Sequence, residues 1–166
     1  SGWLTTGPKA RQFEEEFARY LGQKHAVAVN SCTAALHLAL EAIGLHAGET
    51  VLVPTMTFAA TAEVVRYFNA KPVLVDCRPE DFNLDCADAE NKVEVALARG
   101  ERVRAILPMH YGGQVGNMAG VVDLASRYGL QIIEDAAHCC PALYRESDTA
   151  PWKSVGAESA VSCYSF

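Results

Sequence analysis

Apolar positions in this chain recur with two different spacings, and the two kinds of segment alternate. Recurrence every three or four residues predicts amphipathic helices, whereas short apolar runs bounded by Gly or Pro predict strands. The helices are expected over residues 8–21, 34–43, 57–69, 85–99 and 117–128. The strands are expected over residues 25–29, 50–53, 72–75, 103–107, 130–133 and 160–164. This alternation predicts a three-layer α/β fold, in which a mostly parallel sheet carries helices on both faces.

The length and composition indicate a single domain. The chain has 166 residues, of which 50% are apolar, and this is enough to bury a hydrophobic core. The one irregular stretch, residues 140–158, contains Pro141, Pro151 and Gly156 and is expected to be a long loop or a weak hairpin. The net charge of −6 argues against nucleic acid and against an anionic membrane as partners. We therefore expect a globular protein, and we place it in the cytoplasm.

Six cysteines raise the question of disulfides or a metal site. They include no C-x-x-C pair, and a chain with this much apolar sequence does not need disulfides to fold. We expect reduced thiols, most of them buried, and no bound metal. The alternative that stays open is a metal-binding α/β domain that uses His138, Cys139 and Cys140.

The stretch from Ile132 to His138 is the first candidate for chemistry. A β-branched strand runs into Glu134, Asp135, two alanines and His138 without an intervening Gly or Pro. Open α/β sheets bind ligands beyond the carboxyl ends of their strands, and Asp135 is expected to lie there. The alternative is that Asp135 only caps the following turn. The stretch by itself does not separate the two interpretations.

A candidate phosphate site follows the first expected strand. The chain has neither a G-x-G-x-x-G motif after that strand nor a P-loop motif. Residues 30–35 instead lead into a helix whose free N–H groups lie near the hydroxyls of Ser31 and Thr33, an arrangement that can hold one phosphate. Ordinary N-capping explains the same residues and is favoured when they are considered alone.

Two further stretches end strands at the same edge of the expected sheet. Residues 54–58 place Phe58 at the start of a helix, and residues 108–113 combine His110 with two glycines. A core aromatic and a turn histidine are the simpler interpretations of each stretch alone. Together with Asp135 and His138, however, they outline a crevice with a phosphate end, a ring face and a carboxylate. This combination fits pyridoxal phosphate better than other common cofactors.

Six ordered blocks of sequence resemble one known family. They are residues 2–8 (GWLTTGP), 31–36 (SCTAAL), 54–61 (PTMTFAAT), 70–73 (AKPV), 134–138 (EDAAH) and 162–166 (SCYSF). Through them the chain resembles the DegT/DnrJ/EryC1/StrS family of pyridoxal-phosphate-dependent nucleotide-sugar aminotransferases. The resemblance implies the large domain of a fold-type I enzyme, similar to aspartate aminotransferase and truncated. Residues 1–166 are then a partial domain, with an N-terminal segment and the C-terminal part, including the small domain, absent.

The resemblance also implies roles for single residues. Asp135 faces the pyridine nitrogen of the cofactor, Phe58 stacks on its ring, and His138 lies near its phenolic oxygen. The phosphate is held by the turn from Ser31 to Ala34, with Cys32 and Ala34 contributing backbone, Thr33 contributing its side chain, and Ser165 adding a hydroxyl. Thr6 and Gly7 match a substrate-side segment. His110 fits the family pattern without an assigned role.

The resemblance implies a longer enzyme, of which residues 1–166 form only a part. The cofactor it implies is pyridoxal or pyridoxamine phosphate, the acceptor is a nucleotide-linked keto sugar, the donor is glutamate and the assembly is a homodimer. The Schiff-base lysine follows the residues matched by Ser165 and Phe166, and neither Lys71 nor Lys153 matches it, so we expect residues 1–166 to be inactive. An antiparallel strand beside residues 25–29 would also be missing. A sugar dehydratase of the same family, with histidine in place of lysine, and a non-catalytic truncated pseudoenzyme are the alternatives.

Overall fold

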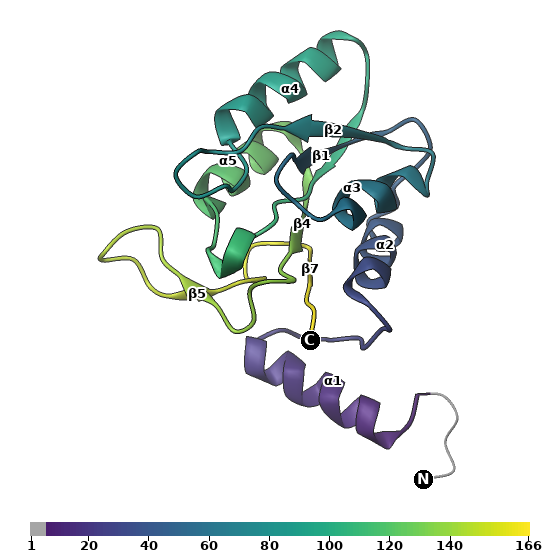
Figure 1. The fold of residues 1–166 in the computed structure, drawn as a ribbon, viewed down its shortest axis with the longest axis vertical. Helices are drawn as coiled ribbons and strands as arrows, with labels where there is room; N and C mark the ends of the chain where they lie inside the picture. Colours follow the sequence, from purple (N-terminus) through teal and green to yellow (C-terminus); the bar gives the residue numbers. More distant parts are fainter. Residues whose placement is uncertain (1–5) are drawn as a thin grey trace.

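A computed structural model describes residues 6–166, so part of the first block of resemblance, residues 2–5, lies outside the described residues. The described chain forms a five-stranded, fully parallel sheet in the order β2-β1-β3-β4-β7 (Figure 1). Its strands are β1 (Thr50–Pro54), β2 (Lys71–Val75), β3 (Val103–Ile106), β4 (Gln131–Asp135) and β7 (Val161–Cys163). The expectation of a mostly parallel α/β sheet is confirmed.

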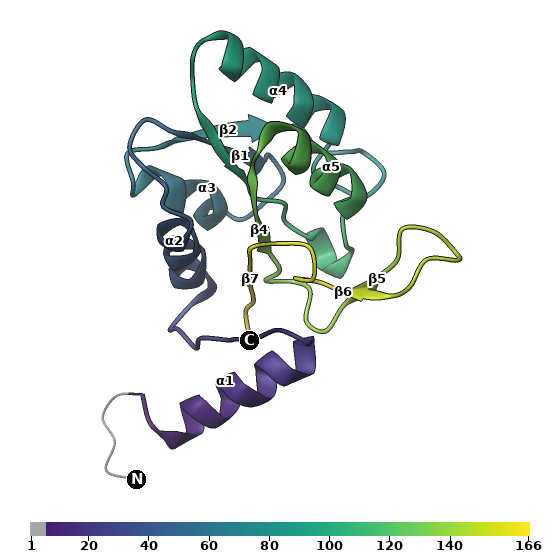
Figure 2. The same cartoon turned by 180° about the vertical axis from the view of Figure 1, so that it is seen from behind.

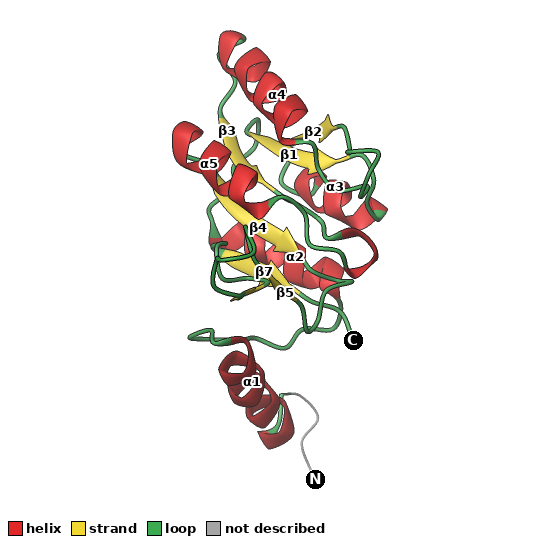
Figure 3. Ribbon diagram, turned by 90° about the vertical axis from the view of Figure 1, so that its left-hand side faces the viewer, coloured by secondary structure: helices red, strands yellow, loops and turns green. Residues whose placement is uncertain are grey.

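Helices cover both faces of the sheet, as the alternating pattern predicted. On one face lie α2 (Cys32–Ala42) and α3 (Ala59–Arg66), and on the other lie α4 (Cys86–Ala98) and α5 (Met118–Tyr128), an arrangement visible from the side in Figure 3. The first helix, α1 (Pro8–Leu21), lies apart from these layers, beside the end of β7 (Figures 1 and 2). The short 3-10 helix η1 (Tyr111–Gly113) follows β3.

The strands are apolar on both faces because both faces are covered by helices. Leu52, Ile106 and Ile132 pack in one cluster with residues of α4 and α5. Their neighbours Val51 and Ile133 pack in the other cluster, with residues of α2 and α3. Successive side chains of a strand point to opposite faces of the sheet, so alternate residues of the same strand belong to different clusters.

Capping residues set the ends of several helices. Ser31 caps α2 and Asn117 caps α5 through their side chains, and α1 ends at Gly22, which has a left-handed φ of 69°. The prediction for residues 57–69 was too long: α3 spans only Ala59–Arg66, and the chain turns away at Asn69, where φ is 54°. The expected hairpin in residues 140–158 is present as β5 (Leu143–Tyr144) paired with β6 (Lys153–Ser154).

The predicted strand at residues 25–29 is wrong. These residues have no regular secondary structure and do not pair with a strand of the described chain, and the exposed fraction of Val27 reaches 76%. A cavity of about 460 Å³ separates the segment from β7, and the backbone N–H of Ala28 binds the Glu14 carboxylate instead of a ladder partner. A strand exists only when a neighbour accepts its hydrogen bonds, and the described chain supplies none here.

Aromatic contacts hold α1 against the end of β7. The ring centroids of Phe13 and Phe17 lie 5.4 Å apart in a stacked arrangement, and Phe17 meets Tyr164 and Phe166 edge-on, each with a centroid distance of 5.3 Å.

Among the described residues, no helix has the length and apolar character needed to cross a membrane.

Candidate functional site

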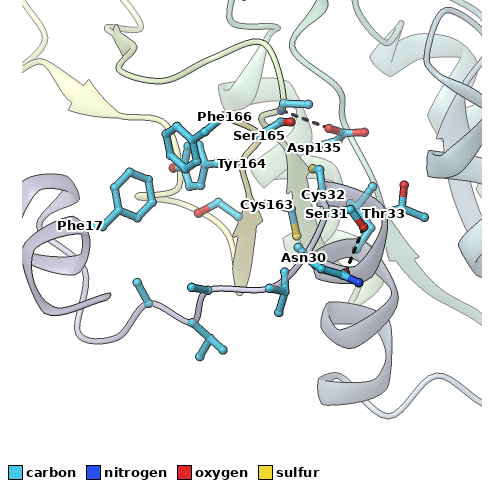
Figure 4. A pocket seen from close by; sticks show the side chains of 18 of the residues that line it. Phe17, Asn30, Ser31, Cys32, Thr33, Asp135, Cys163, Tyr164, Ser165 and Phe166 are labelled. Atoms are coloured by element: carbon cyan, nitrogen blue, oxygen red, sulfur yellow. Dashed lines mark hydrogen bonds between the residues drawn. The ribbon is translucent and has the colours of Figure 1, made fainter. Parts of the chain in front are cut away.

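The loops that follow four neighbouring strands gather at one edge of the sheet, the edge at which open α/β sheets bind ligands. Phe58 follows β1, His110 follows β3, Asp135 ends β4 and Ser165 follows β7. A cavity of about 670 Å³ opens at this edge (Figure 4). The predicted site residues that line it are Ser31, Cys32, Thr33, Phe58, Asp135, His138 and Ser165.

Asp135 is nearly buried, with an exposed fraction of 4%, and both of its carboxylate oxygens accept hydrogen bonds. The hydroxyl of Thr61, on α3, donates to Oδ2 at 2.7 Å, and the backbone N–H of Ala137 donates to Oδ1 at 3.2 Å. The second bond is the turn cap that the sequence offered as an alternative. Asp135 therefore caps the turn and lines the cavity at once, so the two interpretations do not exclude each other. Each oxygen keeps a lone pair for a further donor.

The N-terminus of α2 carries the predicted phosphate turn. The side chain of Ser31 accepts a hydrogen bond from the N–H of Ala34 at 3.1 Å, so the N-cap interpretation is correct. This bond occupies the Ala34 amide, which the resemblance implies for the phosphate, and Ala34 does not line the cavity. The first N–H groups of a helix have no partner within it, so those of Cys32 and Thr33 remain for a ligand. Figure 4 shows Ser31, Cys32 and Thr33 around the same space as Asp135.

Two of the predicted site residues that line the cavity carry rings, Phe58 and His138. Phe58 precedes α3 and has an exposed fraction of 74%, which leaves its face free for a ligand. His138 is exposed, and its Nδ1 accepts a hydrogen bond from the backbone N–H of Gly112 at 3.3 Å. With Nδ1 as acceptor, Nε2 carries the proton and can donate.

The cysteines near the cavity are protonated at neutral pH. Burial, together with the negative charge of Asp135, raises the pKa of Cys32 to about 12. Burial is also the main cause that raises the pKa of Cys163, and it raises that of Cys139 to about 11. All six cysteines are free thiols. Within residues 6–166, no group of three or more His, Cys, Asp or Glu side chains is arranged to hold a metal ion.

Besides Ala34, two more of the predicted site residues lie outside the cavity. Thr6 and Gly7 precede α1 and are absent from the cavity lining. The carbonyl of Gly7 accepts hydrogen bonds from Ala10 and Arg11, so Gly7 acts as the start of that helix. A substrate role for these two residues follows only from the family resemblance, and that role stays a prediction.

Sequence reasoning missed two groups that hold Asp135. Thr61 and Thr57 form a chain of hydroxyls, 2.7 Å apart, that ends on the carboxylate. The signal available was their spacing of four residues, which places both on one side of a helix start. Glu134, the neighbour of Asp135, is fully buried and bonds to His110 at 2.8 Å. A charged residue inside an apolar strand was the signal there.

Comparison with known proteins identifies the family of the chain. The family model of the DegT/DnrJ/EryC1/StrS aminotransferases matches residues 1–166, and the chain belongs to this family. Over 144 residues it is 46% identical to GDP-perosamine synthase of Caulobacter vibrioides, covering 86% of this chain and 37% of that protein. Over 145 residues it is 38% identical to UDP-4-amino-4-deoxy-L-arabinose–oxoglutarate aminotransferase of Shewanella sediminis, covering 87% of this chain and 36% of that protein. The chain thus spans well under half the length of these relatives.

Among solved structures, Spr1654 of Streptococcus pneumoniae superposes on the whole chain. The TM-score is 0.86 at 27% sequence identity, and the match covers 100% of this chain and 43% of that one. Spr1654 has been solved in a PLP-form, a PMP-form and an apo-form. The family and the fold identified from the sequence are confirmed.

The residues present fit pyridoxal phosphate. The cofactor requires an anion site, a flat apolar face and a partner for its ring nitrogen. The cavity provides them in the start of α2, the exposed ring of Phe58 and the nearly buried carboxylate of Asp135. None of the residues that line it is a lysine. Lys71 pairs with Glu101, and Lys153 pairs with Glu146 and Glu158.

Proposed function

We propose that the chain is the cofactor-binding part of a pyridoxal-phosphate-dependent aminotransferase of amino-sugar biosynthesis. The acceptor would be a nucleotide-linked keto sugar, a proposal supported by the names of the two sugar-modifying relatives. Glutamate is the proposed amino donor, because one of those names includes oxoglutarate, the keto acid that glutamate becomes when it gives up its amino group. The observation that carries the proposal is the cavity that joins Asp135, Phe58 and the start of α2.

Each of these residues would have a separate task toward the cofactor. When bound, pyridoxal phosphate supplies the electron sink and carries the amino group. Asp135, ionised and held by Thr61, would keep the ring nitrogen protonated through a charge-assisted hydrogen bond. Phe58 would stack on the ring, while the N–H groups of Cys32 and Thr33 would bind the phosphate with help from Ser165. His138 would lie on the phenolic side.

We also propose that the active protein is a cytoplasmic homodimer. Six free thiols suit a reducing compartment. Several large apolar side chains around the cavity are exposed, including Phe58 and Phe166, with exposed fractions of 74% and 84%. A second subunit would cover such a surface.

The first experiment is a titration of the 166-residue chain with pyridoxamine 5′-phosphate, followed by the fluorescence of the ligand. We expect saturable binding that Asp135→Ala weakens at least tenfold, whereas Leu74→Ala, an exposed position on β2, leaves it unchanged. Absence of binding in the unmodified chain would overturn the cofactor assignment.

Because no lysine lines the cavity, pyridoxal phosphate and borohydride should label no lysine specifically, and the chain alone should show no turnover. Specific labelling of one lysine would contradict this.

A second experiment separates aminotransferase from dehydratase. The codons that follow Phe166 in the gene are read, and the encoded polypeptide is assayed with glutamate and nucleotide-linked keto sugars. A lysine at the position just beyond Phe166 together with amino transfer supports the proposal. A histidine there favours the dehydratase, and an immediate stop codon favours a non-catalytic protein.

A further inference from the structure

A buried histidine and a buried glutamate form a pair next to Asp135, since the glutamate is the residue that precedes it in β4. His110 and Glu134 both have an exposed fraction of 0%, and His110 Nε2 lies 2.8 Å from Glu134 Oε2. The backbone N–H of Gly116 donates to His110 Nδ1 at 3.4 Å. With Nδ1 as the acceptor, the ring proton is on Nε2, which donates to the carboxylate.

The Glu134 carboxylate has a second donor. The backbone N–H of Gly156 lies 3.1 Å from Oε1 and 3.2 Å from Oε2. A buried carboxylate is costly unless it is hydrogen-bonded, and here imidazole and amide satisfy it from two different loops. These hydrogen bonds therefore connect the loop after β3 and the segment after β6 to the carboxyl end of β4.

This connection reaches Asp135 through the backbone. Glu134 and Asp135 are consecutive residues of β4, so their side chains point to opposite faces of the sheet. The N–H of His110 donates to the carbonyl of Asp135 at 3.2 Å, and the N–H of Asp135 donates to the carbonyl of Pro108 at 2.9 Å. Asp135 is thus fixed on both sides of its Cα by the loop that His110 anchors.

The same loop also touches His138. Gly112 donates its N–H to His138 Nδ1 at 3.3 Å, and a Cβ placed on Gly113 would lie 3.2 Å from the carbonyl oxygen of His138. The close approach requires glycine at that place, where φ is 86°. His110 therefore anchors a turn that contacts both ends of the Asp135–His138 stretch.

We propose that His110 is a positioning residue, which acts through Glu134 to hold the Asp135 carboxylate in the orientation that its partner in the cavity requires. The inference rests on the proposed function, because it takes the ring nitrogen of a pyridine cofactor as that partner. His110 does not line the cavity, so its effect on a ligand must pass through residues that do, and Asp135 is the one whose carbonyl accepts the backbone N–H of His110. If the pair only stabilised the fold, its loss would change the affinity for every ligand of the cavity by the same factor.

The experiment compares two ligands that differ in one atom. Pyridoxamine 5′-phosphate and its 1-deaza analogue, in which the ring nitrogen is replaced by carbon, are titrated against the same chain. The ratio of their dissociation constants reports the contact at the ring nitrogen and cancels the shared phosphate and ring contacts. We expect the unmodified chain to prefer pyridoxamine phosphate about tenfold or more and Asp135→Ala to bind both alike.

Variants of the pair then test the inference. His110→Leu should reduce the preference to less than about threefold, and His110→Gln, which keeps an N–H donor toward Glu134, should restore most of it. Val93→Ala removes buried side-chain volume in α4 and serves as the matched control, with lower stability and an unchanged preference. If His110→Leu weakens both ligands equally, or neither, the positioning role is wrong while the proposed function stands. No binding or no preference in the unmodified chain would overturn the proposed function, and this inference with it.

A measurement on the unmodified chain covers the case in which His110→Leu does not fold. Long-range ¹H–¹⁵N spectra of the imidazole report which ring nitrogen carries hydrogen. The expected result is a single Nε2–H tautomer for His110 that Glu134→Gln perturbs, with loss of the ligand preference in the same variant. An Nδ1–H tautomer, or a Glu134→Gln chain that keeps the full preference, would overturn the inference.

Discussion

The Thr61 hydroxyl donates a hydrogen bond of 2.7 Å to Asp135, and this joins the start of α3 to the end of β4. Thr61 is fully buried, and its own oxygen lies 2.7 Å from the hydroxyl of Thr57. With the Thr61 proton on Asp135, Thr57 donates to Thr61. The carboxylate is therefore held by a side chain from one face of the sheet and by the backbone N–H of Ala137, just beyond the end of β4.

Thr61→Val should remove this donor while nearly preserving the volume of the side chain. A hydrogen bond to a charged group contributes about 1.5–3 kcal/mol, so we expect a loss of that size in the free energy of unfolding, measured by urea titration. Pyridoxamine phosphate should also bind more weakly. Thr57→Val is the matched control, because it leaves the Thr61–Asp135 bond intact, and its cost should be smaller. Equal costs for the two variants would show that the bond to Asp135 carries no special weight.

Phe58→Ala should separate ligand binding from stability. The ring is 74% exposed, so its removal should change the free energy of unfolding by no more than about 0.5 kcal/mol. Loss of ring stacking, about 0.5–1.5 kcal/mol, should weaken the binding of pyridoxamine phosphate several-fold. Leu74→Ala removes a side chain of 54% exposure on β2 and should change neither quantity. An unchanged affinity for Phe58→Ala would remove Phe58 from the site.

Cys32 should react slowly with maleimides at pH 8, because burial and the charge of Asp135 raise the pKa of its thiol to about 12. Only the thiolate is nucleophilic, so the rate should climb as the pH approaches that value. The raised pKa also sets a sign for stability: the native state keeps its proton where the unfolded thiol, near 9.0, loses it. The stability contributed by this thiol is present below about pH 9 and is lost toward pH 12. The chain unfolded in urea is the control, and equal rates in both states at pH 8 would contradict the raised pKa.

Much of this fold could be predicted from local sequence, and the rest depended on distant partners. The helix at residues 8–21 was predicted to the residue, because Pro8 starts it and Gly22 ends it with a left-handed φ. Residues 25–29 were predicted wrongly, because a strand also requires a neighbour, which no local pattern reports. Asp135 could be located because it ends a buried strand. Its partner Thr61 could not, because 74 positions separate the two in sequence, and His110 lies 24 positions from Glu134.

Gly156→Ala should be among the more costly glycine substitutions, because three features meet at this buried residue. Its φ is 92°, a Cβ there would lie 2.6 Å from Ser162 Oγ and 3.0 Å from the Tyr164 hydroxyl, and its N–H binds the buried Glu134. Gly48 offers a matched control, since its φ of 81° is similar but a Cβ would meet nothing within 4 Å. Gly48→Ala should therefore cost only the backbone strain, about 1–2 kcal/mol.

Gly156→Ala should cost a further 1–3 kcal/mol or so, because the clash forces side chains or backbone to move. Thermal or urea unfolding of the two variants measures this difference directly. The clash also displaces the amide that binds Glu134, so the hydrogen exchange of that amide should accelerate in Gly156→Ala and not in Gly48→Ala. Equal losses of stability in the two variants would mean that Ser162 and Tyr164 move aside at little cost, and faster exchange of the Gly156 amide would then be the result that still shows a displaced hydrogen bond to Glu134.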